Sequence, residues 1–243
     1  MADHALSFGA AAAAYDRYRP SYPEPAVAWA VGAKPPARVV DVGAGTGILT
    51  RILLRLGFEA APVEPDPAMR AQLEVATPGS TVLAGRAEDL PLPDGSVDGV
   101  VAGQAYHWFD PDRAHAEVAR VLRGGGTFGV LWNLRDETVP WVATLSAIIH
   151  KAGGVPESDR QPDSFGPRFG PVERTDFRHF TRHTVDSLLA MLRTRSYYLT
   201  APGQRQRAFE AAVRDLARTY PDLAGRETFE LPYRTVVYRA CRR

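Results

Sequence analysis

Short apolar runs alternate along the chain with segments in which apolar residues recur at helical spacing. The runs at 39–42, 60–63, 97–102 and 127–132 predict strands, because each is short and bounded by polar or glycine residues. Helical patterns lie between these runs and after the last of them. This alternation favours an α/β fold in which helices cover both faces of a mostly parallel sheet.

The C-terminal part of the chain is less regular. Residues 153–171 hold four glycines and four prolines without any periodicity. So long an irregular stretch inside a compact domain is more typical of a mobile lid than of packed structure. Periodicity then predicts a strand at 172–182, helices at 185–192 and 207–220, and a terminal strand at 227–240.

Composition limits the size and the partners of the protein. The 243 residues, 45% of them hydrophobic, suit a single domain over 1–243 with a cap or lid insertion at 137–171. A net charge of +1 provides no electrostatic basis for binding nucleic acid or an anionic membrane. Cys241 is the only cysteine, which excludes an internal disulfide and favours a reducing compartment. We therefore expect a cytoplasmic monomer or homodimer that binds neither nucleic acid nor membrane.

Three alternate glycines follow the first apolar run. Gly43 and Gly45 can adopt positive φ and let the backbone approach a ligand, while Gly47 allows the next helix to pack closely on the strand. Only Thr46 separates the second glycine from the third, whereas the dinucleotide fingerprint places two residues there. The turn therefore predicts a nucleotide site in which the first helical turn faces the ligand.

Acidic residues define the kind of nucleotide. Glu64 ends the second strand 23 positions after Asp41, a separation suited to a carboxylate that binds both ribose hydroxyls of an adenosine. No Walker lysine follows the glycines, so the turn is poorly suited to a triphosphate. A cationic or zwitterionic nucleoside is the better match.

Two other chemistries are disfavoured. His179 and His183 lie four residues apart, but no acidic residue of the H-E-x-x-H type separates them, so they predict no metal site. The chain also lacks the G-x-S-x-G turn of serine hydrolases.

Several motifs together resemble the class I S-adenosylmethionine-dependent methyltransferases, in particular the small-molecule (type 11, trans-aconitate methyltransferase-like) group. The resemblance rests on 15–23, the glycine turn, Glu64-Pro65, 87–93, 104–110 and 231–235. It implies a Rossmann-like, doubly wound sheet of seven strands whose last strand is antiparallel, and an N-terminal helical lid segment at 1–30. It also implies S-adenosyl-L-methionine as cofactor and S-adenosyl-L-homocysteine as product.

The resemblance assigns a set of cofactor contacts. In this family the N-terminal segment folds over the cofactor, so the Arg19 guanidinium would pair with the methionine carboxylate or with an acidic substrate. The expected cofactor-binding residues are Tyr15, Arg19, Asp41, Gly43, Ala44, Gly45, Gly47, Glu64, Pro65, Ala87, Glu88, Gln104 and Ala105.

His107 is the candidate catalytic residue. A neutral imidazole at the end of a strand could remove the proton of a substrate hydroxyl, but His107 could equally contact the cofactor or substrate, or brace the following helix. A carboxylate acceptor would need no base. Aromatic rings suit a sulfonium and its polarised methyl group. The expected substrate-binding residues are Tyr18, Tyr22, His107, Trp108, Trp132, Arg135 and Tyr197.

The predicted function is methyl transfer to a small molecule by in-line displacement. Oxygen of a carboxylate or hydroxyl is the preferred acceptor, with carbon or nitrogen left open. Residues 103–107 lack the Asn-Pro-Pro-aromatic signature of many relatives that methylate bases or protein amides. One alternative is a protein that binds the cofactor as an effector or for a non-methylating reaction. A nicotinamide-dependent oxidoreductase is disfavoured by the glycine spacing.

Overall fold

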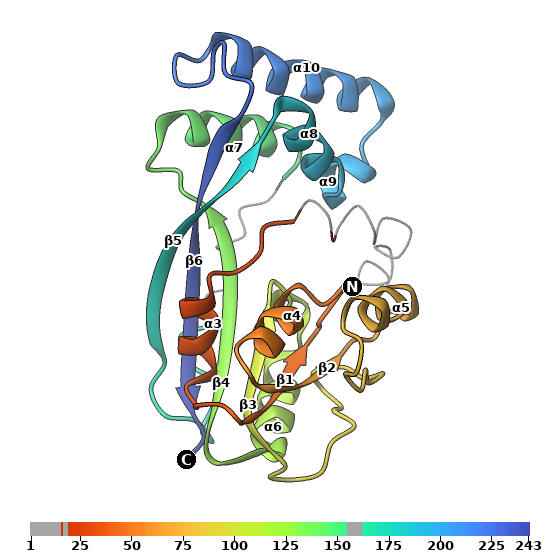
Figure 1. Cartoon of the computed structure of the whole chain (residues 1–243), viewed down its shortest axis with the longest axis vertical. Coiled ribbons are helices and arrows are strands. Elements are labelled where there is room, and N and C mark those ends of the chain that lie inside the picture. The colour runs from red at the N-terminus through yellow and green to blue at the C-terminus, as the bar shows by residue number, and fades with distance from the viewer. Residues whose placement is uncertain (1–15, 17–18, 155–161) are drawn as a thin grey trace.

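A single twisted sheet organises the chain. The computed structural model describes residues 16, 19–154 and 162–243 (Figure 1). The sheet has the order β2-β1-β3-β4-β6-β5, in which β6 is antiparallel to both of its neighbours and the pairs among β1 to β4 are parallel. The strands are β1 (Arg38–Val42), β2 (Glu59–Val63), β3 (Val97–Gly103), β4 (Leu122–Arg135), β5 (Glu173–His183) and β6 (Phe229–Cys241).

Helices cover both faces of this sheet, as the alternating pattern predicts. Val27 of α3 and Ile52 of α4 are buried against one face, and Val118 of α6 is buried against the other. The predicted Rossmann-like, doubly wound architecture is therefore confirmed. The helices of this part are α3 (Glu24–Val31), α4 (Ile48–Arg55), α5 (Pro67–Ala76), the short 3₁₀ helix η2 (Tyr106–Trp108) and α6 (Pro111–Val121).

The prediction of seven strands was wrong, since the described residues form a six-stranded sheet. Leu83 makes only an isolated parallel bridge to Val63, with its N–H donating to the carbonyl of Pro62 (2.9 Å) and its carbonyl accepting from Glu64 (3.0 Å). Extending this ladder to Thr81 would require the N–H of residue 62 as a donor to the Thr81 carbonyl. Proline has no N–H, so the ladder stops.

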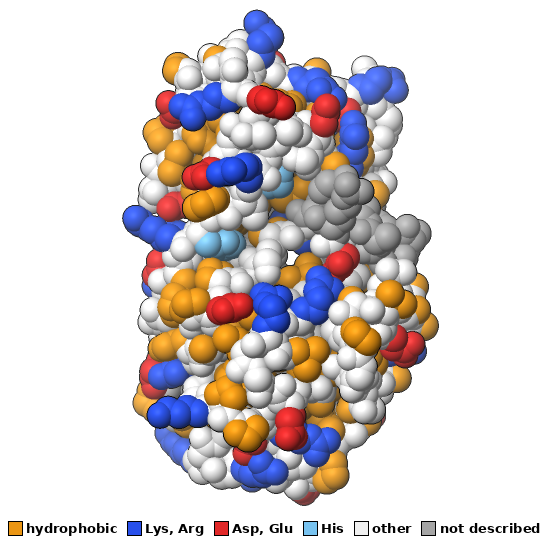
Figure 2. Space-filling model, in the orientation of Figure 1, with side chains coloured by type: hydrophobic (Ala, Val, Ile, Leu, Met, Phe, Trp, Pro, Cys, Tyr) orange, Lys and Arg blue, Asp and Glu red, His pale blue; other side chains and the backbone are white. Residues whose placement is uncertain are grey.

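The surface carries both signs of charge. Lys and Arg side chains are interspersed with Asp and Glu over the face drawn in Figure 2. None of the helices in the described part of the chain is long and apolar enough to cross a membrane.

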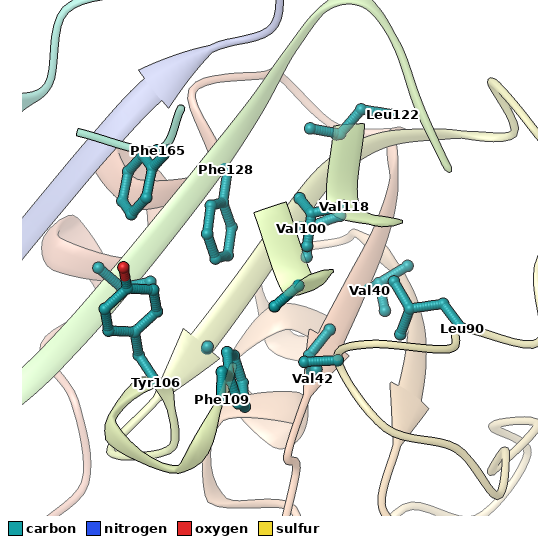
Figure 3. Packing of buried hydrophobic residues seen from close by; sticks show 14 of the residues in the cluster. Val40, Val42, Leu90, Val100, Tyr106, Phe109, Val118, Leu122, Phe128 and Phe165 are labelled. Atoms are coloured by element: carbon teal, nitrogen blue, oxygen red, sulfur yellow. The ribbon is translucent and has the colours of Figure 1, made fainter. Parts of the chain in front are cut away.

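The core beneath α6 is aromatic and close-packed. Phe128 of β4 lies beside Phe165, with ring centroids 4.6 Å apart, and Tyr106 approaches both rings (Figure 3). On the opposite face of β4, α3 passes directly over Gly129 and leaves no room for a side chain. A Cβ at this position would come within 2.5 Å of the Ala30 carbonyl oxygen. The glycine therefore sets how closely α3 approaches the sheet.

Four C-terminal helices form a cap beyond the carboxyl ends of the parallel strands (Figure 1). Residues of α7, α8 and α10 make a separate buried cluster with the beginning of β6, which includes Leu145, Leu189, Val213 and Leu231. The cap helices are α7 (Pro140–Lys151), α8 (Val185–Arg193), α9 (Ser196–Leu199) and α10 (Gly203–Thr219).

Parts of the two segments predicted as lids are packed in the core of the structure. Phe165 and Phe169, from the irregular stretch, are 1% and 2% exposed within the core under α6, so this part is packed and is not a mobile lid. Residues 24–30 of the predicted N-terminal lid form α3 and belong to the core. Residues 1–15 and 155–161 lie outside the described residues, and a lid role for the remaining parts stays a prediction.

Candidate cofactor and active site

The glycine turn between β1 and α4 has the backbone that its sequence predicts. Gly43, Gly45 and Gly47 have φ values of 69°, 58° and 89°, which disfavour any residue with a Cβ. The N–H groups of Gly43 and Ala44 both donate to the Val63 carbonyl, at 2.9 and 3.1 Å. These bonds fix the turn against the end of β2.

The three glycines differ in what surrounds them. A Cβ on Gly43 would meet Ala105 at 2.7 Å, and one on Gly47 would meet Leu73 at 2.6 Å. A Cβ on Gly45 would have no heavy atom of the described residues within 4 Å. Two glycines therefore allow tight packing, while Gly45 leaves an open side on which a ligand can approach the backbone.

Glu64 lies directly beside this open glycine. Its Oε2 accepts the N–H of Gly45 and its Oε1 accepts the N–H of Asp66, each at 2.9 Å. The side chain is 7% exposed, and burial raises its pKa, although the two backbone donors and Arg70 partly offset that effect. The structure thus brings the predicted ribose-binding acid to the glycine turn.

Asp41 is a second buried acid at the same place. Its Oδ2 accepts a 2.6 Å hydrogen bond from Thr50, while its Oδ1 has no hydrogen-bond partner among the described residues. The residue is 1% exposed, and burial raises its pKa to about 7, with the charge of nearby Glu64 adding to the increase. Both acids make the turn favourable for a cation.

The turn after β3 is strained and lies close to the glycines. Gln104 has a φ of 55°, the one positive value of a non-glycine residue in the described chain. Its N–H donates to Leu131 (2.9 Å) and its Nε2 donates to the carbonyl of Asn133 (3.1 Å). Such strain persists only where the surroundings over-determine it, and it is common at ligand sites. Ala105 then packs against Gly43, as described above.

The N-terminal segment contacts the same end of the sheet. Asp16 accepts hydrogen bonds from Thr46 (2.9 Å) and Arg51 (2.8 Å), which ties it to the glycine turn. Tyr22 is buried, and its hydroxyl lies 2.6 Å from where a Cβ of Gly103 would be. Arg19 is partly buried in this segment. The predicted contacts Tyr15 and Tyr18 lie outside the described residues.

His107 lies in η2, immediately after the strained turn. It is partly exposed, and its ring centroid lies 4.8 Å from that of Trp108, which is 46% exposed. Both side chains are therefore accessible from the carboxyl end of β3. Their roles in catalysis and substrate binding stay predictions.

Other predicted contacts lie in the core or hydrogen-bond to other residues of the chain, and their roles in binding stay predictions. Ala87 is buried in the core, and Glu88 accepts the N–H of Asp110 at the start of α6 (2.8 Å). The Pro65 carbonyl accepts from Arg70 (2.7 Å). Trp132 is 4% exposed and packs edge-on to Tyr106, so the structure places it in the core; its Nε1 has no partner among the described residues.

Of the remaining two predicted residues, one connects the sheet to the cap and the other lies within the cap. Arg135, at the end of β4, donates from Nε to Ser146 of α7 (2.9 Å). Tyr197 of α9 packs edge-on to Phe209 of α10.

His183 contacts Thr181 and Ser187, and no group of three metal-ligating side chains occurs among the described residues.

The site also contains residues that sequence reasoning missed. Asp16 and Thr50 have common side chains in unremarkable positions, so no local signal marked them. Asn133 did carry a signal, because asparagine is depleted in strands and this is the only asparagine in the sequence.

Comparison with known proteins supports a single family. A family profile described as a methyltransferase domain matches residues 40–130. An uncharacterised methyltransferase of Mycobacterium tuberculosis is 44% identical over 238 residues, covering 98% of this chain and 96% of that protein. The malonyl-[acyl-carrier protein] O-methyltransferase of Methylococcus capsulatus is 38% identical over 139 residues, covering 51% of this chain and 50% of that protein.

A solved structure agrees with the fold. A protein of Anaeromyxobacter dehalogenans, described as a type II methyltransferase, aligns with a TM-score of 0.67 at 24% identity, over 93% of this chain and 98% of its own. The mycobacterial similarity extends over the sheet and the cap alike, and the profile covers the glycine turn and Glu64. The chain therefore belongs to the class I S-adenosylmethionine-dependent methyltransferases.

Proposed function

We propose that this protein transfers a methyl group from S-adenosyl-L-methionine to an oxygen atom of a small molecule. The observation that carries the proposal is the buried Glu64 carboxylate, which accepts the N–H of Gly45 on the open side of the glycine turn. When bound, this cofactor supplies a methyl group that its sulfonium has already activated. The protein then needs to align the reactants and exclude water, which together can lower a barrier by about 7–11 kcal/mol.

The residues of the turn fit this cofactor. Each oxygen of Glu64 accepts one backbone N–H and keeps capacity for a further donor, so the carboxylate can also accept two ribose hydroxyls. Asp41 offers a buried acceptor, Oδ1, that lacks a partner among the described residues and can satisfy an ammonium group or a water molecule. Two adjacent acids favour a cationic ligand and oppose a pyrophosphate.

The acceptor side lies between the N-terminal segment, η2 and the cap. His107 and Trp108 belong to η2, which follows the carboxyl end of β3, and Arg135 is the last residue of β4. If the acceptor is a hydroxyl, neutral His107 would take its proton during transfer, whereas a carboxylate arrives ionised. The similarity to an enzyme named as an O-methyltransferase supports oxygen as the acceptor atom.

A second candidate function shares every cofactor contact. A protein that binds S-adenosylmethionine as an effector, or for a non-methylating reaction, would use the same turn and the same acid. The partly exposed His107 and the exposed Trp108 next to the strained Gln104 favour catalysis, because an effector site needs no accessible base.

The test has two steps. Titration calorimetry with S-adenosylmethionine and with S-adenosylhomocysteine should show binding of both, and NAD should not bind. Incubation with methyl-labelled cofactor and a panel of carboxylic acids, phenols, alcohols and amines should then transfer label to at least one oxygen acceptor. Tight cofactor binding with no labelled acceptor would favour the second function, and binding of NAD in place of the sulfonium would refute both.

We further propose that the protein acts in the cytoplasm as a monomer or homodimer, without a nucleic-acid or membrane partner. The interspersed surface charge and the net charge of +1 support this. Size-exclusion chromatography with light scattering measures the oligomeric state, and a tetramer or larger assembly would contradict the proposal.

A further inference from the structure

Asn133 uses all the hydrogen-bonding capacity of its side chain. Its Nδ2 donates to the carbonyls of Pro20 (3.3 Å) and Ser21 (3.1 Å), and its Oδ1 accepts from the hydroxyl of Thr235 (2.6 Å). The imidazole of His179 contacts the same Oδ1 at 3.2 Å. The residue is 2% exposed. An amide has two donors and two acceptor sites, and here all four are occupied.

These partners determine the orientation of the amide. Carbonyl oxygens can only accept, so the nitrogen must face Pro20 and Ser21. The oxygen then faces Thr235 and His179, so Nε2 of His179 carries the hydrogen. Burial lowers the pKa of His179 to about 4, which keeps the ring neutral at physiological pH, and the ring stacks on Tyr233 with centroids 5.5 Å apart. Strands β5 and β6 therefore hold the amide in place.

The main chain of Asn133 reaches the predicted cofactor site. Its carbonyl accepts the side-chain amide of Gln104 at 3.1 Å, the residue with the positive φ. Residues 20–22, which the side chain of Asn133 anchors, run between the sheet and the cap and place Tyr22 against Gly103 (Figure 1). One residue thus connects the N-terminal segment to the turn after β3.

We propose that Asn133 is a positioning residue that couples the placement of residues 19–22 to cofactor binding at Gln104. This inference rests on the proposed function. The position needs two donors towards carbonyls and two acceptor sites towards Thr235 and His179, which only the amide of Asn or Gln provides, and Gln is longer by one methylene group. In Asn133→Asp a carboxylate oxygen would face the carbonyl oxygens of Pro20 and Ser21, so both bonds would be replaced by repulsion.

The sequence provides a direct probe in the wild-type protein. Because Asn133 is the only asparagine, labelling with ¹⁵N-asparagine gives one pair of side-chain amide signals in an NMR spectrum. We expect these protons to exchange with solvent at least about tenfold more slowly than those of free asparagine. Adding S-adenosylhomocysteine should shift the pair or slow its exchange further. Fast exchange, or calorimetric binding of S-adenosylhomocysteine without any response of this pair, would overturn the inference.

Variants separate coupling from mere stability. Asn133→Asp should weaken S-adenosylhomocysteine binding by about tenfold or more, and hydrogen exchange of the backbone at 19–24 should become faster. The matched control Thr235→Val removes a donor to the same amide but keeps both bonds to Pro20 and Ser21, so its affinity should fall by less than about threefold. Equal losses in the two variants, following their melting temperatures, would overturn the inference.

Failure of the proposed function would look different. In that case the wild-type chain would not bind S-adenosylhomocysteine at all in the calorimeter. If Asn133→Asp fails to fold, the labelled wild-type protein still decides the inference.

Discussion

Replacing Glu64 with glutamine tests the centre of the predicted cofactor site while keeping the size of the side chain. Both carboxylate oxygens accept a backbone N–H at 2.9 Å, one from Gly45 and one from Asp66. Glutamine has one carbonyl oxygen and one NH₂ group, so one of these two N–H donors would face another donor.

The expected loss of affinity follows from these contacts. Charge-assisted hydrogen bonds to a ligand contribute about 1.5–3 kcal/mol each, and leaving a buried donor unsatisfied costs about 1–3 kcal/mol. We expect S-adenosylhomocysteine binding to weaken by about 2–3 kcal/mol, or roughly 30- to 150-fold. The folded state should change little in stability, because removing a buried charge whose pKa is raised by desolvation offsets part of the lost hydrogen bonding.

Titration calorimetry and thermal unfolding measure the two effects. Asp98→Asn is a matched control, since Asp98 also accepts a backbone N–H, from Arg38 (2.8 Å), but at the opposite end of the sheet. Its affinity should remain within about twofold of wild type. Wild-type affinity in the Glu64→Gln variant, with a folded protein, would refute the assignment of Glu64 to the site.

Three further predictions concern catalysis, pH and packing. His107→Gln should leave cofactor affinity nearly unchanged and lower turnover of a hydroxyl acceptor by about tenfold or more, and an equal loss of cofactor affinity would make it a binding residue. The pKa of Asp41 is about 7 when folded and near 4 when unfolded, so the folded state holds an extra proton in between, and stability should fall by up to about 4 kcal/mol as pH rises through this range. Urea unfolding of wild type and Asp41→Asn at about pH 5 and pH 8 measures this, and equal pH dependence in both would contradict it. Gly129→Ala should destabilise the protein by about 1–3 kcal/mol, because its Cβ meets the Ala30 carbonyl at 2.5 Å. Gly124→Ala is the control, since its Cβ has no described neighbour within 4 Å, and equal melting temperatures would refute the packing argument.

Local sequence patterns were sufficient to predict most of the strands and the centre of the predicted cofactor site. Apolar periodicity predicted β1, β2, β3, β5 and β6 to within a few residues. Strand β4 begins earlier than predicted, at Leu122, and so includes the glycine-rich 124–126 region. Glycine spacing and the position of Glu64 predicted a turn and an acid that the structure places 2.9 Å apart. These features are determined by neighbouring residues, because φ preferences and side-chain periodicity act over a few positions.

Contacts between distant segments were decided only by the tertiary structure. Asn133 meets Pro20, His179 and Thr235, which are separated from it by 113, 46 and 102 positions, and no local pattern specifies such a meeting. From the sequence alone Phe165 belonged to a predicted lid, whereas in the structure it is buried in the core between the sheet and α6. The predicted seventh strand does not form beside β2, because Pro62 has no N–H to donate from that edge. The sequence by itself therefore determined the chemistry of the glycine turn, whereas long-range packing decided which side chains complete the site, because burial and hydrogen bonding depend on what else reaches the same place.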